Sequence, residues 1–164
     1  MRLTTFTDYS LRVLIYLAID PDRRATIGEI AAAFKVSENH LMKVVHFLGK
    51  QHLLTNVRGK GGGMTLALPP AGINIGEVVR LTEAGSIPVE CFDREHNSCV
   101  ITPACKLRRV LGEAVDAFYD ALSRYTLADL VKQPRALAQI LTPHGRLAEI
   151  AQRSEGKPGR RKRA

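Results

Sequence analysis

A pair of short amphipathic helices followed at once by a glycine-rich hairpin constrains the fold of this chain most strongly. The first helix is predicted to begin at Thr26, with Glu29 completing a capping box. Ser37 is the predicted cap of the second helix. Only Lys35 and Val36 separate the two helices, and each helix repeats apolar residues at intervals of three and four. This arrangement predicts a helix-turn-helix, although plain helical hairpins share the pattern.

The segment after the helix pair predicts two strands joined by a basic loop. Residues 53–57 and 64–68 are strand-like, and the loop between them holds four glycines in six residues, together with Arg58 and Lys60. Glycine permits positive φ angles and close backbone approach. A simple flexible hairpin or a phosphate cradle would also explain the glycines, but no strand precedes a GxGxxG pattern and no Walker-type GK[ST] is present. A helix-turn-helix followed by a basic-tipped hairpin predicts a winged helix.

All three cysteines of the 164-residue chain lie in one polar stretch with the spacing C-x7-C-x5-C. The residues between Cys91, Cys99 and Cys105 show no helical or strand period, so we expect a loop. Cysteine usually behaves as a small buried hydrophobe, and an odd number of cysteines argues against a closed disulfide framework. Three interpretations stay open: a Cys3His zinc loop with His96, a disulfide plus one free thiol, and an iron–sulfur cluster held by thiolates. The paired C-x2-4-C spacing usual for zinc is absent.

A long helix is predicted to follow the cysteines over residues 103–125. Thr102 is its expected N-cap and Pro103 its first residue, which places Cys105 in the first turn. A helix N-terminus stabilises thiolate and other negative charge, which favours an anionic centre. The helix also carries a heptad-like apolar seam, which predicts either packing on the chain's own core or a crossed dimer helix. The seam consists of Leu107, Leu111, Ala114, Phe118, Ala121 and Tyr125.

The remaining elements are predicted from caps and apolar periodicity. A first helix is expected over residues 5–18, with Thr5 as its cap and Asp8 completing a capping box. Beyond Pro134 we expect two amphipathic pieces and then a disordered basic tail. Shorter helices are expected over 75–82 after Asn74 and over 127–131 after Thr126.

The charge balance indicates an anionic partner. The net charge is +8, of which the last eight residues contribute five, leaving +3 for the rest of the chain. Aromatic residues make up only 5% and tryptophan is absent, which suits a small helical protein. The apolar run over residues 13–19 is too short to span a membrane. We therefore expect a soluble cytoplasmic protein with reduced thiols and no membrane association.

These motifs together resemble the bacterial iron–sulfur winged-helix repressors, and among them the nitric-oxide-sensing members. The resemblance covers about residues 1–132 and rests on LTTFTDYSLRVLIYLA, SENHLMKVVHFLGKQHLL, VRGKGGGMTLA, the cysteine loop and TLADLV. It implies a homodimer crossed through the long helix, with a cluster held by the three cysteines. It also implies that Asp8 of the partner subunit completes the coordination, which replaces the capping role given to Asp8 above.

The chain departs from the family's pattern at two places, and these bear on which branch of the family it resembles. The first gap between cysteines has seven residues, whereas five or fewer is more usual in the family. Cluster-biogenesis members carry a histidine three residues after the third cysteine, where this chain has Arg108, so that branch is disfavoured. An iron-responsive member remains an alternative because it shares the three cysteines.

The predicted fold is mainly α with a small β-wing. It comprises a winged helix-turn-helix domain (1–84), a cluster-binding loop (85–106), a dimerisation helix with a closing segment (103–132) and a C-terminal extension (133–164). The predicted function is a repressor of a palindromic operator that senses nitric oxide through an iron–sulfur cluster. It loses DNA affinity when the cluster reacts or is lost, and [4Fe–4S] is favoured over [2Fe–2S].

The alternatives are an iron- or redox-responsive repressor and a zinc-stapled DNA-binding protein. No acid–base pair or cofactor motif supports an enzyme. Arg58 is predicted to reach the minor groove and Lys60 a phosphate. Ser37, Asn39, His40 and Lys43 are the predicted DNA contacts of the second helix of the pair.

Overall fold

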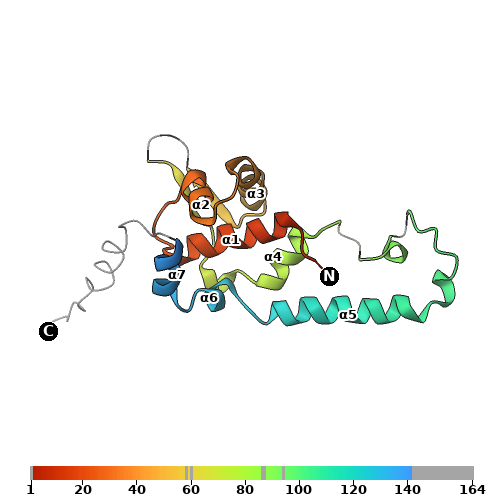
Figure 1. Cartoon of the computed structure of the whole chain (residues 1–164). Helices are drawn as coiled ribbons and strands as arrows, with labels where there is room; N and C mark the ends of the chain where they lie inside the picture. The colour runs from red at the N-terminus through yellow and green to blue at the C-terminus, as the bar shows by residue number, and fades with distance from the viewer. Residues whose placement is uncertain (1, 58, 60, 86–87, 94, 142–164) are drawn as a thin grey trace, which may run out of the picture.

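The computed structural model describes residues 2–57, 59, 61–85, 88–93 and 95–141. Within them the chain is mainly helical, with a two-stranded antiparallel sheet, as the sequence predicts (Figure 1). In chain order the elements are α1 (Thr5–Ile19), α2 (Ile27–Phe34), α3 (Glu38–Lys50), β1 (Leu54–Val57), β2 (Gly63–Leu66), α4 (Ile75–Thr82), α5 (Lys106–Ser123), α6 (Leu127–Leu130) and α7 (Pro134–Leu141).

Helix α1 lies at the centre of a body that also contains α2, α3, α4, α6, α7 and the hairpin (Figure 1). Its side chains Val13 and Leu14 are fully buried against neighbouring helices. The apolar stripes predicted for α2 and α3 face this core, because residues spaced three and four apart share one helix face. The buried residues of these two helices are Ile30, Ala31, Leu41, Val44, Val45 and Leu48.

Side-chain caps fix where α1, α2 and α4 begin. The Thr26–Glu29 capping box of α2 is confirmed, and Asn74 accepts a hydrogen bond from the Glu77 N–H at the start of α4. For α1 the predicted cap was wrong. Thr4 is the N-cap, its Oγ1 accepting from the Thr7 N–H at 3.2 Å.

The cap of α1 therefore lies one residue earlier than predicted, and Asp8 takes no part in a capping box. Thr4 is held there because its N–H and hydroxyl both donate to Glu83 at the end of α4, a contact between distant segments. Ser37 does occupy the N-cap position of α3, but its side chain makes no cap hydrogen bond.

The hairpin is attached to the connection between α1 and α2. Ala25 and Met64 exchange backbone hydrogen bonds of 3.0 and 2.8 Å, so the connection lies along β2 like a third strand. Gly63 makes this approach possible, because it has φ +146° and a Cβ there would lie 2.8 Å from the Ala25 carbonyl oxygen. The predicted tip contacts Arg58 and Lys60 lie outside the described residues.

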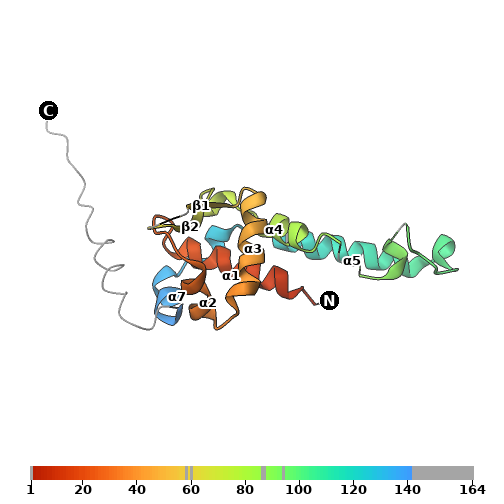
Figure 2. The same ribbon diagram turned by 90° about the horizontal axis from the view of Figure 1, so that it is seen from above.

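Helix α5 and the segment before it project from the body as an arm (Figures 1 and 2). We call α5 and the described residues between α4 and α5 the arm, and the rest of the described chain the body. At the opposite end of the body, α7 packs on α1 with Ala138 buried. Helix α7 corresponds to the first amphipathic piece predicted beyond Pro134. The second piece and the basic tail lie outside the described residues.

The long helix begins later than predicted. Residues Thr102–Ala104 form a 3-10 turn, Cys105 is the N-cap residue, and α5 starts at Lys106. The Thr102 hydroxyl donates to the Cys99 carbonyl at 2.8 Å, so it closes the loop behind it instead of capping α5. Cys105 therefore lies just before the first turn of α5 and not within it.

Candidate nucleic-acid interface and cysteine loop

Helix α3 presents a polar face on the side opposite its buried stripe. Ser37, Asn39, His40 and Lys43 are all exposed, as the sequence predicts for residues that contact DNA. Among the described residues no carboxylate pairs with Lys43, so its charge is available to an anion. The wing hairpin follows α3 directly and packs against it, which places the two predicted DNA-contacting elements side by side.

A hollow of about 320 Å³ lies between the N-terminal half of α1 and this face of α3. His40 and Lys43 form its α3 side, and the rings of Tyr9 and His40 lie 6.2 Å apart. The sequence did not identify Tyr9 as part of this surface, because a tyrosine beside an apolar stripe is expected to lie in the core. The other lining residues are Thr5, Phe6 and Val44.

Asp8 lies one residue before this contact, on the exposed side of α1. Its carboxylate forms a two-pronged ion pair with Arg12, with distances of 2.8 Å to Nη2 and 3.0 Å to Nε. The Arg12 guanidinium also covers the rings of Tyr9 and Phe34. The Asp8 side chain is 47% exposed, and exposed ion pairs contribute little stability, so this carboxylate can exchange partners at small cost.

Acidic and amide side chains close the cysteine loop on itself. Glu90 accepts from both the N–H and the hydroxyl of Ser98, and these hydrogen bonds lower the pKa of the Glu90 carboxyl. Asp93 accepts from the N–H of Glu95 at 2.8 Å and also contacts the His96 ring, and these contacts lower the pKa of Asp93. Such side-chain-to-backbone bonds order a loop that has no regular secondary structure.

The three cysteines are free thiols of intermediate burial. Arg108 donates from Nε to the Cys91 carbonyl at 3.0 Å, and the Cys99 N–H donates to the Asn97 side chain. His96 is 79% exposed and contacts Asp93. Within the described chain, no three Cys, His, Asp or Glu side chains are gathered closely enough to hold one metal ion.

One protomer thus does not assemble the predicted ligand set. The donors themselves still suit an iron–sulfur cluster, because three soft thiol ligands lie on one accessible loop.

A buried carboxylate joins the start of this loop to α1. Glu83 follows α4, is 7% exposed, and accepts hydrogen bonds from the Thr4 N–H and from the Thr4 and Thr7 hydroxyls. The sequence signal was the threonine-rich start of the chain, but nothing local identified its partner. This cluster fixes the turn that carries Asp8 relative to the segment where the arm leaves the body.

Comparison with known proteins identifies the family. The sequence model of the Rrf2 family, described as an iron-dependent transcriptional regulator, matches residues 3–133. The chain belongs to the Rrf2 family. This Rrf2 protein is also 49% identical over 142 residues to the HTH-type transcriptional regulator NsrR of Bacillus subtilis, covering 86% of the chain and 97% of the relative. NsrR of Shouchella clausii is 47% identical over 146 residues, covering 87% and 98%.

Solved structures support the same fold for this Rrf2 protein. T. potens IscR superposes with a TM-score of 0.65 and 26% identity, covering 80% of the chain and 87% of that structure. CymR, the global cysteine regulator of B. subtilis, gives a TM-score of 0.64 and 29% identity, covering 79% and 95%. The predicted winged-helix class is confirmed. No helix among the described residues is long and apolar enough to cross a membrane.

Proposed function

We propose that this protein is an iron–sulfur-dependent transcriptional repressor that binds operator DNA as a homodimer and releases it in response to nitric oxide. The observation that carries this proposal is the identity of nearly one half to NsrR proteins over almost their entire length. The exposed polar face of α3 and the three free thiols supply the two chemistries that such a repressor needs.

In this proposal α3 enters the major groove and the wing lies along the neighbouring minor groove. Asn39 and Lys43 would contact base edges and phosphates, with Ser37 and His40 beside them. Arg58 would enter a narrow A·T-rich minor groove and Lys60 would contact a phosphate. The exposure of the α3 residues and the direct attachment of the hairpin to the α1–α2 connection support this assignment.

The thiolates of Cys91, Cys99 and Cys105 would hold the cluster, with Asp8 of the partner subunit as the fourth ligand. When bound, the cluster would supply iron that reacts with nitric oxide. A carboxylate oxygen matches a sulfur-rich iron centre less well than a thiolate does, so the Asp8 position is the one most open to exchange. Among the described residues the one ion pair of Asp8 is with Arg12, and its exposure supports its availability to a second chain.

Such an arrangement would connect sensing to DNA binding mechanically. Asp8 lies on α1, which packs against α3 in the body, whereas the cysteines lie on the arm. A bond between them in a dimer ties the arm of one protomer to the body of the other. Release of Asp8 removes that restraint on the spacing of the two α3 helices, and the two states must then differ in DNA affinity.

Anaerobic purification followed by nitric oxide titration tests the proposal. We expect a coloured protein whose visible absorption changes with added nitric oxide, and whose binding to an operator duplex weakens in parallel. A colourless protein that contains zinc would contradict the cluster and favour the zinc-stapled DNA binder.

An iron-responsive repressor is the second candidate, and the description of the matching family as iron-dependent favours it. Depleting iron during growth separates the two candidates. Loss of repression on iron depletion, combined with DNA binding that nitric oxide leaves unchanged in the cluster-loaded protein, would assign iron as the signal. The visible and electron paramagnetic resonance spectra of the same protein distinguish [4Fe–4S] from [2Fe–2S].

A further inference from the structure

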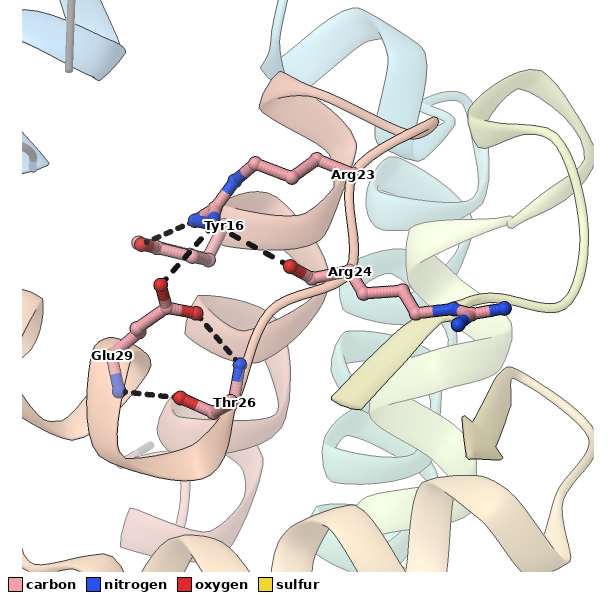
Figure 3. Close-up of polar contacts among 5 residues, drawn as sticks. All are labelled: Tyr16, Arg23, Arg24, Thr26 and Glu29. Atoms are coloured by element: carbon pink, nitrogen blue, oxygen red, sulfur yellow. Dashed lines mark hydrogen bonds and ion pairs between the residues drawn. The ribbon is translucent and has the colours of Figure 1, made fainter. Parts of the chain in front are cut away.

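Two adjacent arginines in the connection between α1 and α2 have opposite surroundings (Figure 3). The Arg23 guanidinium is hydrogen-bonded to neighbouring residues of the body. Its Nη2 donates to the Tyr16 hydroxyl at 3.2 Å, and its Nη1 donates to Glu29 at 3.2 Å and to the Arg24 carbonyl at 3.4 Å. These contacts join α1 to the capping box of α2, so Arg23 stabilises the start of the helix-turn-helix.

Arg24 points the other way, toward the wing (Figure 3). Among the described residues its guanidinium makes a single hydrogen bond, a long one of 3.4 Å from Nη1 to the Gly61 carbonyl, and it has no carboxylate partner. The residue is exposed. An arginine side chain has five N–H donors in a planar fork, so most of the donors of Arg24 face solvent.

The backbone beside Arg24 is firmly held. Ala25, the next residue, is paired with Met64 of β2 in both directions, and the Arg24 Cβ lies 3.3 Å from the position of a Cβ at Gly63. The side chain therefore extends from a fixed point at the base of the wing. A fixed base, and a guanidinium that among the described residues makes one long hydrogen bond and no ion pair, suit a residue that recognises an external anion.

The start of α2 does not itself supply an anion site. The Thr26 N–H is taken by Glu29 Oε2 at 2.8 Å, and the Thr26 hydroxyl accepts from the Glu29 N–H. A carboxylate at this position also repels phosphate. Arg24 is then the cation that would allow a DNA strand to pass close to this side of the wing.

We propose that Arg24 is a DNA-backbone contact, whose guanidinium holds the Gly61 carbonyl on one side and a phosphate oxygen of the bound duplex on the other. Arginine recognises phosphate with two parallel N–H donors, which fixes position as well as charge. The proposal rests on the proposed DNA-binding function. It adds a contact that positions the wing on the duplex without reading its sequence.

Salt-dependent binding of the cluster-loaded dimer tests this role. The probes are an operator duplex selected by the wild-type protein from random sequence and a scrambled duplex of equal length. We expect Arg24→Ala to reduce affinity about five- to tenfold near 0.15 M salt on both duplexes, and to lower the slope of log affinity against log salt by about one. Arg24→Lys should restore most of the slope, and the melting temperature should not change.

Arg23→Ala is the matched control, because it removes the same charge from the adjacent position. It should lower the melting temperature and leave the salt slope unchanged. Arg23→Gln serves the same purpose if Arg23→Ala fails to fold.

Equal slope changes for Arg23 and Arg24 variants would overturn the proposal, as would an affinity loss confined to the operator or no loss at all. Failure of the wild-type dimer to bind either duplex would instead contradict the proposed function itself.

Discussion

The body and the arm differ in how much of their structure one chain can complete. In the body, side chains such as Leu14, Ile30 and Leu48 are fully buried by neighbours from the same chain. In the arm, α5 has no buried residue at all, and Leu107, Val110 and Val100 are 61%, 53% and 91% exposed. Apolar surface of this extent normally marks an interaction site. The core of the body is thus completed by one chain, whereas the arm leaves apolar surface uncovered that the proposed dimer would bury.

The largest expected effect is loss of the cluster from the arm while the stability of the body stays unchanged. Replacing Cys91, Cys99 or Cys105 singly with Ala should abolish the visible absorption of the anaerobically purified protein, because each thiolate would be a ligand. The body should still unfold at its usual temperature in circular dichroism, since no cysteine contributes to its core. Ser98→Ala in the same loop is the control and should keep the absorption. A cysteine variant with full colour and iron content would remove that residue from the ligand set.

A pair of leucine substitutions tests whether the arm depends on a second chain. Leu14→Ala in the body should cost about 2–5 kcal/mol of unfolding free energy, because Leu14 is completely buried. Leu107→Ala removes the same atoms from an exposed site and should change the stability of a protomer by less than about 0.5 kcal/mol. It should nevertheless weaken dimerisation, measured by sedimentation over a range of concentrations. An unchanged dimer dissociation constant for Leu107→Ala would exclude this part of the seam from the interface.

Local sequence rules predicted the body well, because its boundaries depend on residues three or four positions apart. The capping box at Thr26 and the cap at Asn74 were correct for this reason. The errors arose where a distant or competing partner decided the outcome. Thr4 caps α1 because Glu83, directly after α4, anchors it, and the Thr102 hydroxyl donates to the carbonyl of Cys99 in place of capping α5. Neither the Thr4–Glu83 bond nor the Thr102–Cys99 bond can be recognised from the capping pattern of the sequence.

The candidate site was predictable in composition but not in arrangement. The spacing of the cysteines and the basic, glycine-rich loop were visible in the sequence, and the exposure of Asn39 and Lys43 follows from helical periodicity. Contacts between residues far apart in the chain were not visible in the sequence. The sequence therefore predicted neither the contact of Tyr9 with His40 nor the hydrogen bond from Arg24 to Gly61. The proposed coordination by Asp8 involves a second chain, and sequence periodicity carries no information about it.

In the proposed dimer Asp8 would connect the two regions, so its removal should affect the coupling between nitric oxide and DNA binding more than stability. We expect Asp8→Ala to retain a cluster, with water or a thiol as substitute ligand. The ratio of DNA affinities before and after nitric oxide treatment should shrink toward one, from a coupling typically of about 5- to 150-fold. Arg12→Ala is the control for the ion pair alone, since it removes the same contact from the other side. If both variants change the ratio equally, Asp8 acts through its ion pair with Arg12 and is no ligand. If Asp8→Ala changes neither spectrum nor affinity, Asp8 has no part in sensing.

The smallest expected effect lies where the chain returns from the arm to the body. Asp129 accepts hydrogen bonds from the Thr126 N–H and hydroxyl, both at 2.9 Å, and pairs with Lys132 at 3.0 Å. The Thr126 N–H bond, followed by the contacts with Lys132 and the Thr126 hydroxyl, lowers the pKa of Asp129 from its usual 3.8 to about 2. A carboxyl whose pKa falls on folding stabilises the folded state above its unfolded pKa, and that contribution is lost as the pH falls from about 4 to about 2.

Asp129→Asn keeps an acceptor for the Thr126 N–H but removes the charge, so it should lower the melting temperature slightly at pH 7. The difference from wild type should shrink between pH 4 and pH 2, because the wild-type carboxyl becomes protonated in that range. This effect bears on the comparison of body and arm because the helix that begins after Thr126 follows α5 and contains Leu127, which is fully buried in the core of the body. Thermal melts of both proteins from pH 2 to pH 7 measure it. A melting difference that stays constant over this range would show that the charge of Asp129 does not stabilise this junction.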